Sequence, residues 1–213
     1  MRDCMFYVAD LNMEETFKGF LLRDKFYLSL GCGKFEFDPV VDITRAKGRA
    51  DGGLWRHARI LLEGYQQTHQ RLVVCLDRDF GGSPGQEKIR EDITRQLVAA
   101  GWEEKNFVVL VIDPELEQWI WQDSEHVERA LKHTRPPTLR EHLAATGEWP
   151  EGSPKPLDPK STLQKIVDRS RLDRSSDLYG KITSRVSVKN CVDPEFHRFA
   201  ETLRTWFPPE AAA

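Results

Sequence analysis

Carboxylate side chains follow three apolar segments of this sequence, at the point where each segment ends. The segments and their acids are CMFYVAD (4–10) with Asp10, RLVVCLD (71–77) with Asp77 and Asp79, and NFVVLVID (106–113) with Asp113, Glu115 and Glu117. In an open parallel α/β sheet the carboxyl ends of the strands share one edge, which is where ligands bind. If the three segments are strands of such a sheet, we expect these acids to lie together.

The pair Asp77 and Asp79 is separated by a single residue, Arg78. Alternate side chains of an extended chain point the same way, so both aspartates can face one ligand. Grouped carboxylates repel one another and are normally kept by a bound cation or by shared protons. Oxygen ligands suit a hard ion, Mg²⁺ above all and Mn²⁺ as the second candidate, and the expected chemistry is phosphoryl transfer or phosphodiester hydrolysis.

Each acid also has a simpler interpretation. A single Asp at the end of a strand is more often a helix N-cap or a turn former than a ligand. Asp113 before Pro114 fits the cap of a following helix, on which Glu115 would be solvated. Glu14 and Glu15 fit a helix N-terminus, where acidic side chains are favoured. Only the shared position at three strand ends favours a common site.

The loop TRAKGRADGG (44–53) carries three cationic side chains, Arg45, Lys47 and Arg49. One interpretation is a phosphate-binding loop beside the acids that neutralises a nucleic-acid backbone. The other is a solvated, mobile loop, and the sequence leaves both open. The turn FGGSPG (80–85) lacks the GK[ST] of a P-loop, which argues against ATP binding.

Apolar periodicity predicts the elements that would position these residues. We expect strands at 4–10, 25–30 (KFYLSL), 34–43 (KFEFDPVVDI), 71–77 and 106–113, and helices at 12–22, 54–70, 86–100 and, starting at Pro114, 115–122. This alternation predicts an α/β domain with a mostly parallel sheet over about residues 1–125. The proline-rich remainder, with helices near 161–170 and 193–207, predicts a helical annex, residues 126–213, packed on the same domain.

The composition fits a globular protein with one good core. The chain has 213 residues, of which 39% are hydrophobic and 31% charged, and a formal net charge of −3, so bulk charge does not indicate nucleic-acid binding. Its four cysteines are scattered and form no CxxC pair, which predicts reduced thiols. No apolar stretch approaches the roughly 18 residues of a membrane span, so we expect a cytoplasmic protein without a membrane partner.

The acidic motifs resemble the Toprim-like group, the metal-binding α/β domain of topoisomerases, primases and overcoming-lysogenization-defect nucleases. That group has an acid ending the first strand beside a Glu-containing helix and an Asp-x-Asp ending a central strand. Its small stand-alone bacterial branch adds a PE-x-E-x-W helix start. The matching stretches here are VADLNMEETF (8–17), CLDRDF (75–80) and DPELEQWIW (113–121), with weaker likeness in PKSTLQKIV (159–167) and PEFHRFAETLRTW (194–206).

The resemblance implies a Toprim-like, Rossmann-like fold and a Mg²⁺ site that acts on phosphodiesters of nucleic acid. Small subunits of methylation-associated anti-phage defence systems are a close likeness, which implies other defence-system proteins as partners and leaves the oligomeric state open. The expected roles are catalysis for Asp10, Glu14, Asp77 and Asp79, metal ligation for Asp10, Asp77 and Asp79, an acidic edge of Asp113, Glu115 and Glu117, and phosphate binding for Arg45, Lys47 and Arg49.

The sequence departs from the group's pattern at one position, and this difference leads to two functional hypotheses. The group's first acid is normally Glu followed by Gly, whereas this sequence has Asp10 and Leu11. An aspartate is one methylene shorter, and a misplacement of about 1 Å can cost roughly a hundredfold in rate. The first hypothesis is therefore a Mg²⁺-dependent nuclease in which Glu14 or Glu15 compensates. The second is a catalytically degenerate interaction subunit of a larger defence complex.

Overall fold

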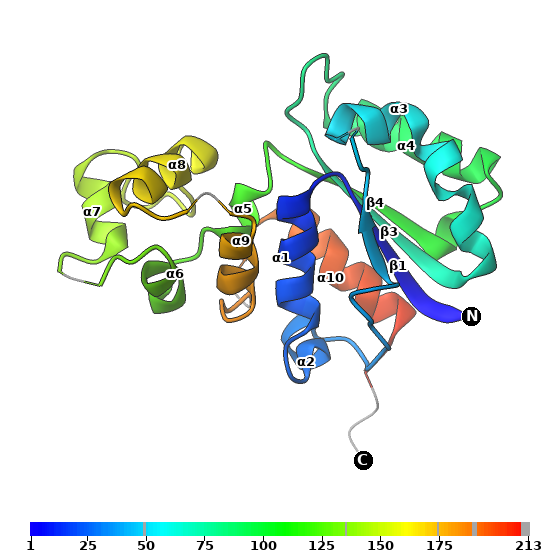
Figure 1. Cartoon of the computed structure of the whole chain (residues 1–213), viewed down its shortest axis with the longest axis horizontal. Helices are drawn as coiled ribbons and strands as arrows, with labels where there is room; N and C mark the ends of the chain where they lie inside the picture. Colours follow the sequence, from blue (N-terminus) through cyan, green and yellow to red (C-terminus); the bar gives the residue numbers. More distant parts are fainter. Residues whose placement is uncertain (49, 135, 174, 189–190, 210–213) are drawn as a thin grey trace.

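The computed structural model describes residues 1–48, 50–134, 136–173, 175–188 and 191–209, and a four-stranded sheet lies at its centre (Figure 1). The strands are β1 (Arg2–Val8), β2 (Ile43–Arg45), β3 (His69–Asp77) and β4 (Phe107–Ile112), in the order β2-β1-β3-β4 and all parallel. β1, β3 and β4 are buried along most of their length, as expected for parallel strands covered on both faces. The predicted α/β class with a parallel sheet flanked by helices is confirmed.

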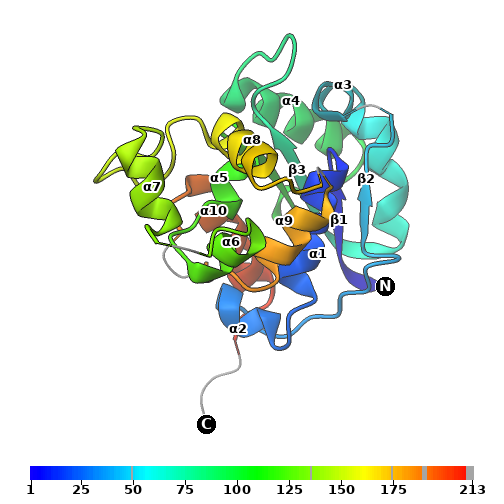
Figure 2. The same cartoon turned by 60° about the vertical axis from the view of Figure 1, so that its left-hand side comes forward.

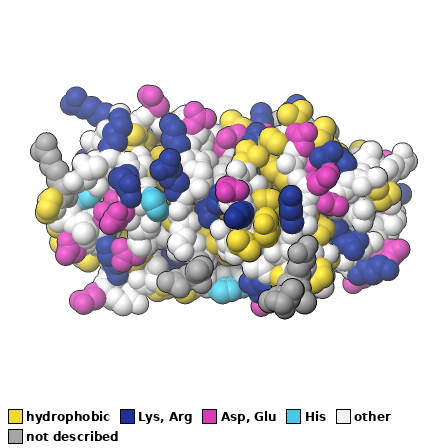
Figure 3. Space-filling view, turned by 90° about the horizontal axis from the view of Figure 1, so that it is seen from below, with side chains coloured by type: hydrophobic (Ala, Val, Ile, Leu, Met, Phe, Trp, Pro, Cys, Tyr) yellow, Lys and Arg dark blue, Asp and Glu magenta, His cyan; other side chains and the backbone are white. Residues whose placement is uncertain are grey.

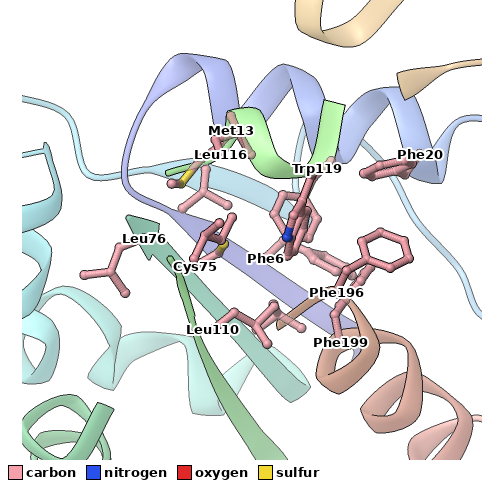
Figure 4. Close-up of a cluster of buried hydrophobic side chains, with 14 of the residues drawn as sticks. Phe6, Met13, Phe20, Cys75, Leu76, Leu110, Leu116, Trp119, Phe196 and Phe199 are labelled. Atoms are coloured by element: carbon pink, nitrogen blue, oxygen red, sulfur yellow. The ribbon is translucent and has the colours of Figure 1, made fainter. Parts of the chain in front are cut away.

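Helices cover the two faces of this sheet. α3 (Ala50–Leu62) and α4 (Gln86–Ala99) lie side by side on one face, and α1 (Leu11–Leu21) and α10 (Pro194–Trp206) lie on the other (Figure 1). On the second face, the ring of Phe6 lies 6.4 Å from that of Phe199 (Figure 4). The ring of Phe17 lies 5.7 Å from that of Phe6 and 5.4 Å from that of Phe199. The last helix therefore completes the core around the first strand.

The outer edge of β4 is closed at Val111. Glu195, in the first turn of α10, accepts the Val111 N–H at 2.9 Å and pairs with Arg90 of α4 at 2.7 Å. Gln86 donates to the Val111 carbonyl at 2.7 Å. Unpaired backbone groups at a sheet edge are a template for pairing with another chain, so these side chains block that position.

A second group of short helices lies beside α1, and Figure 2 brings it forward. Its members are α5 (Glu117–Ile120), α6 (Glu125–Ala130), α7 (Leu139–Ala145), α8 (Pro159–Arg169) and α9 (Asp177–Thr183). α9 packs closely on α1 because Gly19 has no side chain: a Cβ there would lie 2.1 Å from Thr183 Oγ1. The boundary expected at residue 125 stays a prediction. No helix in the described part of the chain has the length and apolarity to cross a bilayer.

The segment 25–30, KFYLSL, is not the strand that its composition predicts. Residues Phe26–Leu30 form a short helix, α2, which ends at Gly31 in a left-handed conformation (φ 71°). Phe26 and Leu30 are the buried positions, and their spacing of four matches one helical face. The strand position beside β1 is taken instead by residues 43–45.

The expected strand 34–43 is also wrong, apart from its last residue. Residues 34–42 are irregular, although Phe35 is buried against Phe207 with ring centres 4.4 Å apart. Pro39 has no N–H to give to a sheet ladder, and strand pairing begins only at Ile43. Three further boundaries differ from the expected ones. α3 starts at Ala50 and is followed by a 3₁₀ turn, η1 (Glu63–Gln67), and a second 3₁₀ turn, η2 (Glu104–Asn106), precedes β4. α5 starts at Glu117 rather than at Pro114.

Candidate metal centre

The centre of the candidate site is Asp77, the last residue of β3. β3 pairs with both β1 and β4, so Asp77 stands between the ends of two other strands. Its side chain is buried, with 8% of the residue exposed, and Oδ1 has no hydrogen-bond partner within the described residues. Buried polar groups are almost always satisfied, so an orphaned carboxylate oxygen points to a missing partner.

Four further acids surround Asp77, and we call these five residues the acid cluster. Burial raises the pKa of Asp77 well above its ordinary value, and the charges of Asp51, Glu117, Asp10 and Glu115 raise it further. The four come from the start of α3, the segment after β4 and the end of β1. Of the acids expected to lie together, Asp10, Glu115 and Glu117 are thus near enough to Asp77 to act on its pKa, and Asp51 is an extra member from a helix. Their role as one site stays a prediction.

Asp51 is that extra member, and it contacts Asp77 directly. Its Oδ1 accepts the backbone N–H of Asp77 at 2.8 Å. Burial raises the pKa of Asp51, and the charge of Asp10 adds to that effect. Asp51 lies in the first turn of α3, where the helix dipole favours a carboxylate. The residue therefore fixes the end of β3 while it adds negative charge to the cluster.

Glu117 is buried, and an uncharged side chain donates a hydrogen bond to its carboxyl group. The hydroxyl of Tyr179, from α9, donates to its Oε1 at 2.6 Å. Burial raises the pKa of Glu117 despite this bond, and burial together with the nearby Glu117 carboxylate raises the pKa of Tyr179. The second helix group thus supplies a side chain to the acid cluster.

Lys160 brings a positive charge to this cluster. Its ammonium pairs with the Glu115 carboxylate, and it lies in the first turn of α8. The hydrogen bond to Glu115 raises the pKa of Lys160, and the charges of Glu117 and Asp77 raise it further. One paired lysine leaves the five carboxyls with an excess of negative charge if all of them ionise.

The acids near the start of α1 have local partners. Asp10 is the N-cap of α1, because its Oδ1 accepts the Met13 N–H at 2.9 Å. Glu14 pairs with Lys18 at 2.7 Å and also with Arg45. Burial would raise the pKa of Glu14, but the hydrogen bonds from Lys18 and Arg45 outweigh it and lower the pKa. The Arg45 guanidinium is therefore paired with the Glu14 carboxylate, whereas Lys47 is exposed.

The side chains of Asp79 and Asp113 pair with an arginine and are not part of the acid cluster. Both pair with Arg78, at 3.2 Å and 2.9 Å, and their side chains are 59% and 42% exposed. β3 ends at Asp77, and the Asp79 N–H donates to the Pro114 carbonyl at 3.2 Å. Asp113 does not cap α5, whose N-cap is Leu116 without a side-chain bond. Arg49, expected to bind phosphate, lies outside the described residues.

The carboxylate oxygens of the acid cluster are the kind of ligand that a hard divalent cation prefers, although the side chains are not close enough to one another to coordinate an ion. Within the described ranges no three His, Cys, Asp or Glu side chains are grouped closely enough to hold an ion. The orphaned Asp77 Oδ1 and the raised pKa values of Asp77, Asp51 and Glu117 are what a cation would relieve. Oxygen donors of this kind suit Mg²⁺ or Mn²⁺.

Sequence reasoning missed three members of this site. Asp51 lies in a segment expected to be a polar loop, and α3 starts at Ala50, four residues earlier than expected, which makes Asp51 a first-turn acid. Lys160 lies in PKSTLQKIV (159–167), a stretch that stands out only because it resembles the Toprim-like group. Tyr179 carries no sequence signal, because only the packing of α9 on α1 and α5 brings it to Glu117.

Comparison with known proteins supports the fold alone. No protein-family model matches the sequence, and no curated protein sequence matches it. Among solved structures, the chain is similar to the C-terminal region of the Burkholderia pseudomallei OLD protein, with a TM-score of 0.52 and 11% sequence identity. The match covers 95% of this chain and 97% of that one. The chain therefore has the predicted Toprim-like α/β fold with a C-terminal helical part.

Proposed function

We propose that this protein is a Mg²⁺-dependent nuclease that hydrolyses phosphodiester bonds of nucleic acid, with Mn²⁺ as a substitute metal. The observation that carries the proposal is the buried, orphaned carboxylate oxygen of Asp77 among four other acids at the carboxyl edge of the sheet. The similarity of fold to the C-terminal region of the OLD protein and the resemblance of the three acidic motifs support it.

In this proposal Asp77 is the main metal ligand, and Asp10 and Asp79 complete the set. Asp10 uses one oxygen to cap α1 and retains the other, and the exposed Asp79 would turn from Arg78 to the ion. A bound divalent ion would polarise the phosphate and lower the pKa of an attacking water. Asp51 holds the Asp77 backbone in place.

The remaining charged residues would handle the substrate. Lys160 is the cation at the acid cluster and would contact a phosphate oxygen when it leaves Glu115. Asp10 or Glu14 would accept the proton of the attacking water, and Glu115 and Glu117 would balance the charge. Lys47 would contact the nucleic-acid backbone, together with Arg45 if it leaves Glu14, and phosphate binding by Arg49 stays a prediction from the sequence.

A double variant tests the proposal. We expect Asp77→Asn with Asp79→Asn to abolish Mg²⁺-dependent cleavage of single-stranded and duplex DNA and RNA, and Asp77→Asn alone to remove saturable Mg²⁺ binding in calorimetry. Asp173→Asn, an exposed acid in the second helix group, is the matched control and should change neither. Cleavage that survives in the double variant would show that another site does the chemistry.

The second candidate is a catalytically degenerate interaction subunit. Specific observations favour it: Asp10 caps a helix, Asp79 pairs with Arg78, and Glu14 is neutralised by two cations. This candidate predicts no cleavage with either metal and co-purification with proteins encoded nearby. The role in bacterial anti-phage defence, in either form, follows from the motif resemblance, and co-purification from cells that carry the neighbouring genes tests it.

A further inference from the structure

An aromatic pair and an arginine lie beside the acid cluster, and we call these three residues the ring surface. Trp55 of α3 and Phe80 of the β3–α4 loop are half-buried, with ring centres 5.8 Å apart. The guanidinium carbon of Arg56 lies 5.5 Å from the centre of the Trp55 ring. Arg56 itself is exposed.

The rings are held against the same helix turn that carries Asp51. A Cβ built on Gly52 would lie 3.3 Å from the Phe80 ring, so this ring covers the first turn of α3. The Trp55 Nε1 donates to Asp92 of α4 at 3.2 Å, which fixes its orientation. Because Asp51 bonds to the Asp77 backbone, the ring surface begins one helical turn from the acid cluster.

Within the described residues, Arg56 has no acid to neutralise it. No carboxylate pairs with it in the part of the chain that the structure describes, whereas Asp92 is already paired with Lys88 at 2.9 Å and Arg95 at 3.3 Å. The protein is otherwise of mixed charge: on the face in Figure 3, basic and acidic side chains are interspersed. A cation stacked on a ring and free of carboxylates is suited to a phosphate on a stacked nucleotide.

We propose that the ring surface binds an unpaired base and its phosphate, so that the substrate class of this site is single-stranded nucleic acid. This inference rests on the proposed function and narrows it. Aromatic rings stack on any exposed base, and Arg adds a cation–π contact and a charge for the backbone. Bases inside a duplex are already stacked and cannot reach the rings without unpairing.

Equilibrium binding tests the proposal without catalysis. The probe is a fluorescein-labelled single-stranded DNA of about 15 nucleotides, compared with a duplex of equal length, by anisotropy in EDTA and again in Ca²⁺. We expect the single strand to bind more tightly, Phe80→Leu and Arg56→Ala to weaken it roughly 5- to 20-fold, and Phe80→Tyr to retain it. Arg129→Ala is the control, since Arg129 is exposed on α6 in the other helix group and should leave binding unchanged.

The outcomes separate this inference from the proposed function. Equal binding of duplex and single strand, or unchanged binding by folded Phe80→Leu and Arg56→Ala proteins, overturns the ring surface, even if the wild type cleaves DNA with Mg²⁺. Conversely, selective loss of single-strand binding in these variants supports it, even if the wild type cleaves nothing. Thermal unfolding of each variant confirms that a loss of binding is not a loss of fold.

Discussion

Replacing Asp77 by Asn removes a buried ionisable carboxyl from among four others with little change in the size of the side chain. Asp77 has a raised pKa because burial and its acidic neighbours disfavour ionisation. An ionised Asp77 therefore destabilises the metal-free fold. We expect Asp77→Asn, measured in EDTA at neutral pH, to be more stable than the wild type, an unusual result for a buried polar residue at the end of a central strand.

The sign and size follow from linkage. The folded-state pKa of Asp77 is higher than that of the unfolded chain, about 4, so wild-type stability falls as the pH rises from about 4 through the folded-state pKa and then levels off. Each unit of pKa difference corresponds to about 1.4 kcal/mol. Partial solvation of the cluster and the polar amide reduce the gain, and we expect about 1–3 kcal/mol, or roughly 2–4 °C in Tm for each kcal/mol.

Bound metal should make the wild type more stable than Asp77→Asn. A cation that binds only the folded wild type stabilises it by about 2.7 kcal/mol at a concentration one hundred times its Kd, and Asp77→Asn should lose most of that gain. Urea unfolding followed by circular dichroism, in EDTA and in excess Mg²⁺, between pH 4 and pH 8, measures both effects. Asp173→Asn is the control, because Asp173 is exposed and substitutions of such surface residues usually change stability by no more than about 0.5 kcal/mol.

One result would refute this reasoning. If Asp77→Asn unfolds at lower urea concentration than the wild type in EDTA at neutral pH, the Asp77 carboxylate already has a compensating partner in the metal-free protein. A stability difference that stays constant from pH 4 to pH 8 would point the same way, since the effect depends on ionisation.

Two further predictions concern buried polar pairs. Tyr179→Phe removes the donor to the Glu117 carboxyl and should cost about 1–3 kcal/mol in urea unfolding, whereas Tyr179→Phe combined with Glu117→Gln should cost less than the sum of the two single changes. Asp42 is fully buried and bonds to Arg2 (2.6 Å) and His69 (3.2 Å). Burial would raise its pKa, but the hydrogen bonds from Arg2, the Asp38 backbone and His69, together with the charge of Arg2, outweigh that effect and lower it. Because its folded-state pKa is lowered, its stabilisation is present above about pH 4 and is lost as the pH falls through the folded-state value. Asp42→Asn should therefore cost about 3 kcal/mol at pH 7 and progressively less as the pH falls below about 4; a cost that does not depend on pH would contradict the ionic assignment.

The place of Asp77 was predictable because its strand is continuously apolar and ends abruptly in an acid. Glu117 was predictable for a similar reason, as an acid just after the next strand. The alternation argument for Asp79 assumes that the chain stays extended. β3 ends at Asp77, the Arg78 N–H donates to the Ile112 carbonyl at 2.8 Å, and the Asp79 side chain pairs with Arg78, so its role as a metal ligand stays a prediction.

The partners of Asp77 depend on contacts that are distant in sequence. Asp51 approaches it across 26 residues, because β3 returns beside β1 and places its end at the start of α3. Tyr179 reaches Glu117 across 62 residues. Periodicity reports which face of an element is apolar, but it does not report which end of one element meets which end of another. The helix at 26–30 was missed because a short apolar run has no clear period.

The position of α10 has a consequence for how the protein is made. A ribosome releases the chain from its N-terminus, so β1 and α1 emerge long before Phe196 and Phe199, which cover their aromatic side chains on the finished molecule (Figure 4). Until the last helix is synthesised, Phe6, Phe17 and Phe20 lack that cover, and Glu195 has not yet closed the Val111 edge. Before α10 is made, the nascent chain therefore presents uncovered aromatic rings and an open strand edge, which are the features that favour aggregation during folding.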